Sequence, residues 1–163
     1  MAKVKEEKTN VMRVLDQKKI PNTPHANPHR DGEAPDGVTV ARSLGQDPER
    51  VFKTLVTRGA SGGYYVFDIP VADTLDLKKA AKAAGEKAVE LVHVRELLGL
   101  TGYVRGGCSP VGMKKAFPTV FDESVSRLPS VSVSAGRIGF QIECAPADLL
   151  GLTRARTAPV TTD

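Results

Sequence analysis

The sequence predicts a single mixed α+β domain with enough strands to curl or close into a barrel. A chain of 163 residues fits one domain with a continuous core. With 40% apolar and 26% charged residues, it has the composition of an ordinary globular protein. Several short strand patterns alternate with hairpin-type turns and short helical segments, which favours the α+β class.

The charged residues 1–8 are expected to form a flexible N-terminal segment, and the domain is expected over residues 9–152. Thr9 can cap a helix whose apolar residues Val11, Val14 and Leu15 lie on one face. Prolines should end this helix, because proline lacks a backbone donor and restricts the residue before it. A turn-rich loop then precedes two short helical segments, expected at residues 38–44 and 48–50.

The middle of the chain predicts a β-hairpin made of residues 51–57 and 64–69, with Gly62 and Gly63 in the turn. Residues 76–84 are rich in Lys and Ala and predict a helix closed by Gly85. Further elements are expected as a strand at 88–92, a helical turn through Leu98 closed by Gly99, strands at 119–121, 131–134 and 140–144, and a helical turn at 147–150. Residues 153–163 are expected to form a flexible tail.

The charge and the cysteine content indicate which partners and which cellular compartment to expect. The chain has 23 Lys and Arg residues and 19 Asp and Glu residues, which gives a net charge of +4. This mild excess permits a polyanionic partner such as RNA, bound through few contacts. No apolar run is long enough to span a membrane, and the N-terminus does not resemble a secretory signal. A cytoplasmic protein is therefore expected, with Cys108 and Cys144 as free thiols.

The most distinctive segment is the glycine loop, residues 102–112, which holds four glycines and a proline. Glycine adopts positive φ easily and lets a ligand approach the backbone, so the loop can present amide groups to an anion or a developing oxyanion. A tight turn between two strands explains the same composition equally well. The loop matches neither the Walker pattern nor the dinucleotide-binding glycine pattern.

Four side-chain types in the sequence could carry chemistry. Lys53 lies in an apolar strand, where either its stem packs and its head reaches water, or its ammonium meets an anion. His25 and His29 are four residues apart, but neighbouring prolines prevent a regular helix, so we expect loop histidines rather than a zinc site. Cys108 lacks an assignable base and is expected to be inert. Ser134 could be a sheet residue or a ligand donor.

Four sequence blocks, taken together in this order and spacing, resemble the YbaK/EbsC family of aminoacyl-tRNA deacylases. They are Val51-Phe52-Lys53-Thr54-Leu55, Leu75-Asp76-Leu77-Lys78-Lys79, the segment 101–112, and the segment 132–139. His25 and His29 are similar to the family's first histidine pair. The resemblance spans residues 9–152 and implies a mixed β-sheet curled into a barrel with flanking helices.

The resemblance also implies a function, namely hydrolysis of cysteine wrongly esterified to tRNA(Pro), in trans and beside prolyl-tRNA synthetase. In that family the substrate's own thiol attacks its carbonyl, and no metal or cofactor is used. By this resemblance Lys53 and Gly106 are the catalytic candidates. The implied substrate-binding residues are Thr54, Gly107, Ser109, Pro110, Ser134, Gln141 and His25.

Two departures from the family pattern affect substrate choice. Gln141 stands where an acidic residue is common, and Asn27 replaces a tyrosine often found between the histidines. Two alternatives therefore stay open. The first is a deacylase for another small amino acid, such as alanine or serine. The second is a non-catalytic module that binds the tRNA acceptor end or a synthetase.

Overall fold

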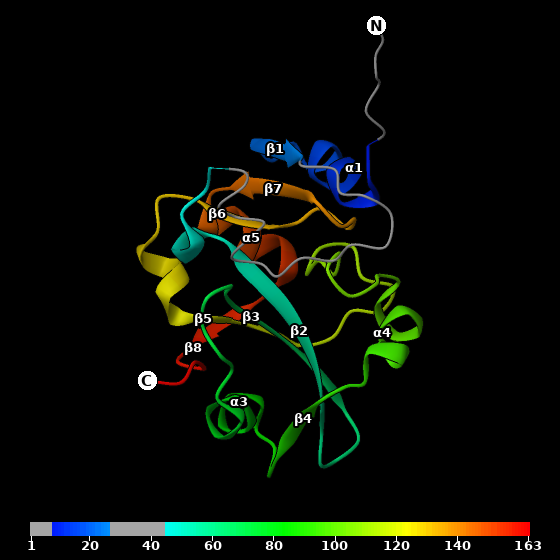
Figure 1. Ribbon diagram of the computed structural model, residues 1–163, viewed down its shortest axis with the longest axis vertical. Coiled ribbons are helices and arrows are strands. Elements are labelled where there is room, and N and C mark those ends of the chain that lie inside the picture. Colours follow the sequence, from blue (N-terminus) through cyan, green and yellow to red (C-terminus); the bar gives the residue numbers. More distant parts are fainter. Residues whose placement is uncertain (1–7, 27–44) are drawn as a thin grey trace, which may run out of the picture.

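The computed structural model describes residues 8–26 and 45–163, which form two β-sheets with helices packed around them (Figure 1). The larger sheet has five strands in the order β4-β2-β3-β5-β8. The β2–β3 and β2–β4 pairs are antiparallel, whereas the β3–β5 and β5–β8 pairs are parallel. The strand bounds are β2 Phe52–Gly59, β3 Tyr64–Pro70, β4 Val89–Leu91, β5 Thr119–Asp122 and β8 Arg156–Ala158.

The smaller sheet has three antiparallel strands, β1 (Asn22–Ala26), β7 (Phe140–Cys144) and β6 (Val131–Ser134), in that order. A single isolated bridge, Val51 to Ser132, links the two sheets in the described part of the chain. The α+β class is confirmed, but the predicted barrel is wrong because neither sheet closes on itself. A closed barrel would need a continuous ladder of hydrogen bonds between the two sheets, and in the described residues the Val51–Ser132 bridge alone forms there.

Four helices surround the sheets in residues 8–26 and 45–163. They are α1 (Asn10–Gln17), α3 (Leu77–Ala84), α4 (Val94–Thr101) and α5 (Pro146–Thr153), with 3-10 turns η1 at Pro48–Arg50 and η2 at Glu123–Arg127. The Thr9 hydroxyl caps α1, as the sequence predicted, and the Asp76 carboxylate caps α3. Helix α4 continues past Gly99 and ends at Gly102, whose positive φ closes it. Within these residues no helix is long and apolar enough to cross a membrane.

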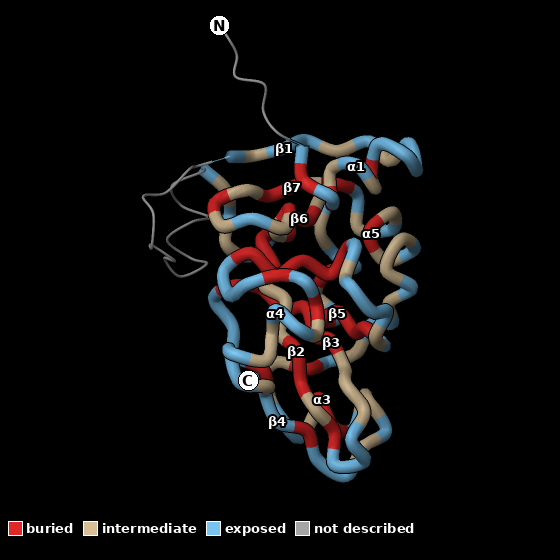
Figure 2. The backbone as a smooth tube through the Cα atoms, turned by 90° about the vertical axis from the view of Figure 1, so that its right-hand side faces the viewer, coloured by how far each residue is buried: buried red, intermediate tan, exposed pale blue. Residues whose placement is uncertain are grey.

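Two apolar clusters lie on opposite faces of the five-stranded sheet. The larger contains Phe52, Val56 and Phe121 from that sheet, together with buried residues of the three-stranded sheet, α1 and α5. The smaller contains Phe67 and Ile69 packed against alanines of α3. Figure 2 shows the buried backbone concentrated in these strands, with exposed positions at the loops and helix surfaces. Alternation along β2 therefore sends successive side chains into different environments.

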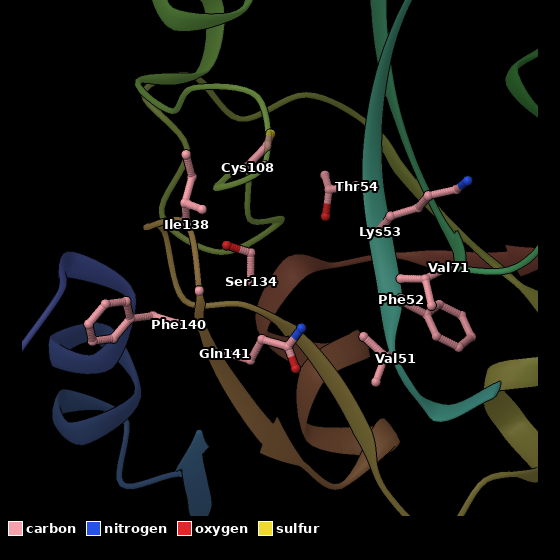
Figure 3. A pocket seen from close by; sticks show the side chains of 12 residues that line it. Val51, Phe52, Lys53, Thr54, Val71, Cys108, Ser134, Ile138, Phe140 and Gln141 are labelled. Atoms are coloured by element: carbon pink, nitrogen blue, oxygen red, sulfur yellow. The ribbon is translucent and has the colours of Figure 1, made fainter. Parts of the chain in front are cut away.

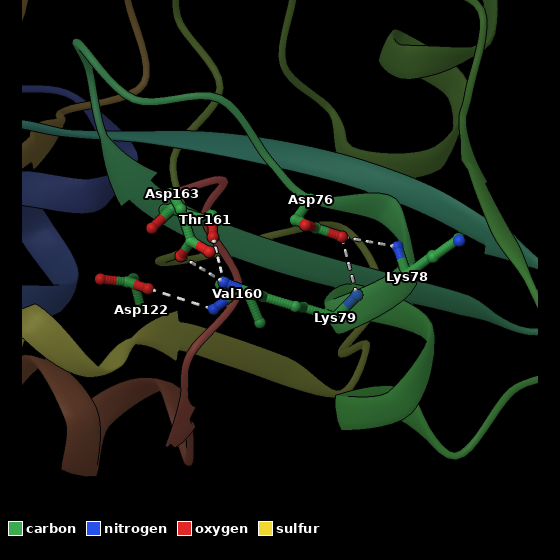
Figure 4. Close-up of polar contacts among 7 residues, drawn as sticks. All are labelled: Asp76, Lys78, Lys79, Asp122, Val160, Thr161 and Asp163. Atoms are coloured by element: carbon green, nitrogen blue, oxygen red, sulfur yellow. Dashed lines mark hydrogen bonds and ion pairs between the residues drawn. The ribbon is translucent and has the colours of Figure 1, made fainter.

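The C-terminal segment differs from the flexible tail expected at residues 153–163. Thr153 ends α5, residues 156–158 form β8, and Val160 is completely buried in the smaller cluster. The backbone N–H of Val160 donates to the Asp122 carboxylate, and the Lys79 ammonium contacts both the Thr161 carbonyl and the Asp163 carboxylate (Figure 4). The segment is held in place by the parallel pairing of β8 with β5 and by the burial of Val160, although its composition is typical of a flexible tail.

Other predicted segments lie outside the described residues. These are the N-terminal segment at residues 1–7, the expected helix at 38–44, His29 and Asn27.

Candidate active site

A pocket of about 120 Å³ lies where the start of β2 faces the three-stranded sheet and the glycine loop (Figure 3). Its walls come from Val51 and residues 52–54 of β2, Gly106 and Cys108 of the glycine loop, Ser134 at the end of β6, and residues 138–141. A pocket of this size suits a small ligand group rather than a large side chain.

Polar side chains cover the face of the three-stranded sheet that borders the pocket. Ser134 of β6 pairs in register with Gln141 of β7, so both side chains lie on one face. The Ser134 hydroxyl accepts a hydrogen bond from the Gly136 N–H at 3.1 Å. Gln141 is only 8% exposed, and its buried Oε1 has no partner among the described residues. A buried acceptor without a partner marks a place where a ligand donor would be favourable.

The glycine loop supplies backbone groups to the same pocket. Gly106 has φ +88°, a conformation that glycine adopts without steric cost. The N–H of Gly107 is used within the loop, since it donates to the Val104 carbonyl at 3.0 Å. The amides of Gly106 and Cys108 have no such partner among the described residues. Both residues line the pocket, which makes their N–H groups candidate donors to a bound ligand.

The loop also fits tightly against the Ala135–Gly139 turn. A Cβ at Gly107 would lie 3.1 Å from the Ile138 nitrogen and 3.2 Å from two backbone atoms of Arg137. Such contacts with backbone leave no flexible atom to move aside. The close approach of two loops from different parts of the chain explains why glycine stands at this position.

Cys108 lies in the pocket wall as an uncharged thiol. Its residue is 8% exposed, and burial raises the pKa of the thiol to about 12, with the nearby Asp68 carboxyl adding to the shift. A nucleophilic cysteine needs a lowered thiol pKa, because the thiolate is the reactive form. The surroundings of Cys108 therefore favour packing over catalysis.

Lys53 borders the pocket, but its charged end does not enter it. Figure 3 shows the Lys53 ammonium pointing away from Ser134 and Cys108. Strand alternation explains this direction, because Thr54 shares a face with Phe52 and Lys53 lies on the other face. Partial burial lowers the pKa of the ammonium, and the Asp73 carboxylate raises it by a smaller amount.

The structure adds one residue that sequence reasoning missed, Asp68 on β3. Asp68 is completely buried and stands directly opposite Thr54 in the β2–β3 ladder. The Thr54 hydroxyl donates to its Oδ1 at 2.5 Å. Burial raises the pKa of the Asp68 carboxyl to about 8, and the bond from Thr54 lowers it by a smaller amount. A carboxyl inside the apolar run of residues 64–70 was the available sequence signal, and the hairpin turn fixes its register with Thr54.

Four of the predicted substrate-binding residues are not among those that line this pocket. Ser109 is fully buried, and its hydroxyl accepts from the Val111 N–H at 3.2 Å, which stabilises the loop. Pro110 borders a separate cavity of about 220 Å³. His25 lies on β1 rather than in a loop, and its Nε2 is 2.8 Å from Oε1 of Glu143. Gly107 underlies the pocket through its contact with the 135–139 turn.

Metal binding has no evident place in the described residues. Across residues 8–26 and 45–163, no group of three or more His, Cys, Asp or Glu side chains could hold a metal ion. His25 is paired with Glu143, whose other carboxylate oxygen accepts from the Ser130 hydroxyl. The polar groups in and beside the pocket are backbone amides, hydroxyls and the buried Asp68 carboxyl.

Comparisons with known proteins identify the family. The family model for the aminoacyl-tRNA editing domain matches residues 32–152. A protein of Enterococcus faecalis, named as a Cys-tRNA(Pro)/Cys-tRNA(Cys) deacylase, EbsC, is 47% identical over 167 residues, covering 99% of each chain. A crystal structure described as a trans-editing enzyme for prolyl tRNA synthetase has TM-score 0.80 and 26% identity, covering 94% of this chain and 95% of its own. The structure of a hypothetical protein has TM-score 0.82 and 26% identity, covering 93% and 99%. The chain therefore belongs to the aminoacyl-tRNA editing domain family, as its resemblance to YbaK/EbsC proteins predicted.

Proposed function

We propose that this protein is a trans-editing deacylase that removes cysteine from mischarged tRNA(Pro). The observation that carries the proposal is the small pocket whose wall contains Gly106 and Cys108, with backbone amides that have no backbone partner among the described residues. The E. faecalis relative, named as a deacylase of Cys-tRNA(Pro) and Cys-tRNA(Cys), supports the substrate class. A cytoplasmic location follows from this role in translation.

An aminoacyl ester needs little chemical activation from the protein. Its carbonyl is already reactive, so catalysis depends on holding it and stabilising the oxyanion that develops. The amides of Gly106 and Cys108 would donate to that oxygen. Loss of one such donor typically lowers kcat by about a hundredfold to a thousandfold. This requirement explains how a pocket without an ionised nucleophile can catalyse deacylation.

The proposed nucleophile is the thiol of the substrate's cysteine. Its sulfur forms a bond to the carbonyl carbon of the same residue while the thiol proton is lost to solvent. The bond between that carbon and the terminal ribose oxygen then breaks, and the oxygen takes up a proton. The tRNA leaves, and water opens the resulting four-membered thiolactone to free cysteine. Gly106 contributes to this step through its backbone amide, while the side chains of the pocket orient the aminoacyl group.

Lys53 has a positioning role in this proposal. Its ammonium would contact phosphate oxygens of the terminal nucleotide at the open edge of β2, where a charged lysine meets an anion without losing its solvent. The remaining pocket side chains, Thr54, Ser134 and Gln141, would contact the aminoacyl group. The crystal structure described as a trans-editing enzyme for prolyl tRNA synthetase favours the acceptor end of tRNA(Pro) as the partner.

The decisive experiment measures deacylation of tRNA(Pro) charged in turn with cysteine, serine, alanine and proline. Cysteine should be released much faster than the other three, and Cys-tRNA(Cys) serves as the test of tRNA selectivity. Serine is the matched control, since it replaces only the thiol by a hydroxyl. Comparable release of serine and cysteine would instead indicate a protein-placed water and a broader deacylase. No release above buffer from any substrate would refute the enzymatic proposal and favour a binding module.

A further inference from the structure

Asp68 is a polar residue behind the pocket wall that the proposed chemistry does not use. It is completely buried, and the Thr54 hydroxyl of the wall donates to its Oδ1 at 2.5 Å. Its other oxygen, Oδ2, is buried without a partner among the described residues. A carboxyl so enclosed is costly to ionise, because its charged form loses hydration. Its influence on a ligand therefore acts through Thr54.

The bond to Asp68 determines what Thr54 can offer a ligand. A hydroxyl has one hydrogen and two lone pairs, and here the hydrogen is given to the Asp68 carboxyl. Thr54 lines the pocket, so its oxygen faces a ligand as an acceptor. Replacing the carboxyl by an apolar group would free the hydroxyl to rotate and present its hydrogen instead. Asp68 thereby fixes the hydrogen-bonding polarity at this point of the wall.

Among the described residues, no cation is paired with the Asp68 carboxyl. Burial raises the pKa of this carboxyl, and the Thr54 hydrogen bond offsets part of the shift. The Lys53 ammonium lies on the opposite face of β2 and points away from the pocket. The group that a cationic ligand would meet at this point of the wall is therefore the acceptor oxygen of Thr54.

An aminoacyl ester carries one cationic donor, the α-ammonium group, on the carbon next to the ester carbonyl. We propose that Thr54, oriented by Asp68, accepts a hydrogen bond from this α-ammonium group, so that the pair selects acyl groups with a free α-amino function. The inference rests on the proposed function and names a specificity contact within the same pocket. Asp68 is a positioning residue, because it acts through Thr54.

The test compares two substrates that differ only in the α-amino group. These are cysteinyl-tRNA(Pro) and 3-mercaptopropionyl-tRNA(Pro), which keeps the thiol and the ester. The measured quantity is the ratio of their kcat/KM values in the wild type and in each variant of the full chain. Differences in intrinsic reactivity between the esters cancel when ratios are compared between variants. The desamino substrate is smaller, so steric exclusion cannot produce the preference.

Thr54→Val removes the acceptor with little change in shape. It should lower the ratio about tenfold to a hundredfold, the range expected for a hydrogen bond to a charged group, mainly through loss of cysteinyl-tRNA turnover. Thr54→Ser keeps the hydroxyl and should retain most of the preference. If the valine variant folds poorly, the serine variant still tests whether the hydroxyl carries the preference. Asp68→Leu removes the acceptor of the Thr54 hydrogen and should lower the ratio severalfold, whereas Asp68→Asn keeps an amide oxygen that accepts from Thr54 and should retain most of the preference. Thr57→Val, which removes a buried hydroxyl from the other face of β2, should change it less than twofold.

The outcomes separate this inference from the proposed function. If the wild type hydrolyses both substrates and the ratio is the same in Thr54→Val, the α-ammonium assignment is wrong while the deacylase proposal stands. If the wild type hydrolyses neither, the proposed function fails and this inference fails with it. A ratio that falls in Thr54→Val and stays high in Thr54→Ser supports it.

Discussion

Replacing Asp68 with asparagine should make the folded protein more stable at neutral pH, although the change removes a residue next to the pocket. Asparagine imitates the protonated carboxyl, and its amide oxygen can still accept from Thr54. The folded-state pKa of about 8 lies above the ordinary value of 3.8, so the folded protein keeps a proton that the unfolded chain releases. Stability contributed by this proton is complete below about pH 4 and is lost progressively as the pH rises toward 8.

The size of the effect follows from the two pKa values. Each unit of difference corresponds to about 1.4 kcal/mol, so between pH 4 and 8 the wild type loses about that much stability per pH unit. The loss relative to acid pH is about 2 kcal/mol at pH 5 and about 4 kcal/mol at pH 7. Asp68→Asn lacks this dependence. An unpaired amide hydrogen in the variant costs about 1 kcal/mol at every pH, so it does not alter how the stability difference between variant and wild type changes with pH.

The assay is urea unfolding followed by far-UV circular dichroism at pH 5, 6 and 7. The stability difference between Asp68→Asn and wild type should grow by about 2 kcal/mol in favour of the variant from pH 5 to pH 7. Glu123→Gln, an exposed carboxyl in η2, is the control and should show no comparable growth. A constant difference across this range would show that Asp68 is ionised in the folded protein, and the reasoning about its burial would be wrong.

Three further predictions concern the pocket. Lys53→Ala should lower kcat/KM for Cys-tRNA(Pro) at least about a hundredfold with an unchanged melting temperature, and Lys53→Arg should keep part of the activity. Equal inactivity of both, with a pH–rate limb near neutrality, would assign proton transfer to the lysine. Cys108→Ala should keep most deacylation activity because the buried thiol, with a pKa of about 12, stays protonated; a loss of about a thousandfold would contradict this. Gly107→Ala should lower stability by about 1–3 kcal/mol and reduce turnover, since its Cβ would meet the Ile138 nitrogen at 3.1 Å. Gly99→Ala, with open space around it in α4, should raise stability by about 0.5–1 kcal/mol; similar melting temperatures for the two variants would refute the packing argument.

Local signals predicted most helices and strands because their causes lie within a few residues. The hairpin of β2 and β3 follows from two apolar runs around Gly62-Gly63, and α3 follows from its Asp76 cap and its closing glycine. The end of α4 was placed too early, at Gly99, since a glycine can be tolerated inside a helix when the true closing glycine lies three residues later. β8 was missed because its order comes from parallel pairing with a distant strand.

The site was only partly predictable from the sequence. Of the predicted site residues, the structure brings Gly106, Ser134 and Gln141 together with Lys53 and Thr54 around one pocket, whereas Gly107, Ser109, Pro110 and His25 do not line it. Sequence blocks identify residues that belong together in a family, but they do not determine which way a side chain leaves its strand. The register of a hairpin does determine this.

The alternation along β6 and β7 separates two kinds of substitution. Val133 and Ile142 lie in the apolar cluster, while their sequence neighbours Ser134 and Gln141 line the pocket. Substitutions at Ser134 and Gln141 can thus alter the shape and polarity of the pocket without opening a cavity in the core. Substitutions at Val133 and Ile142 act on packing and leave the pocket side chains in place.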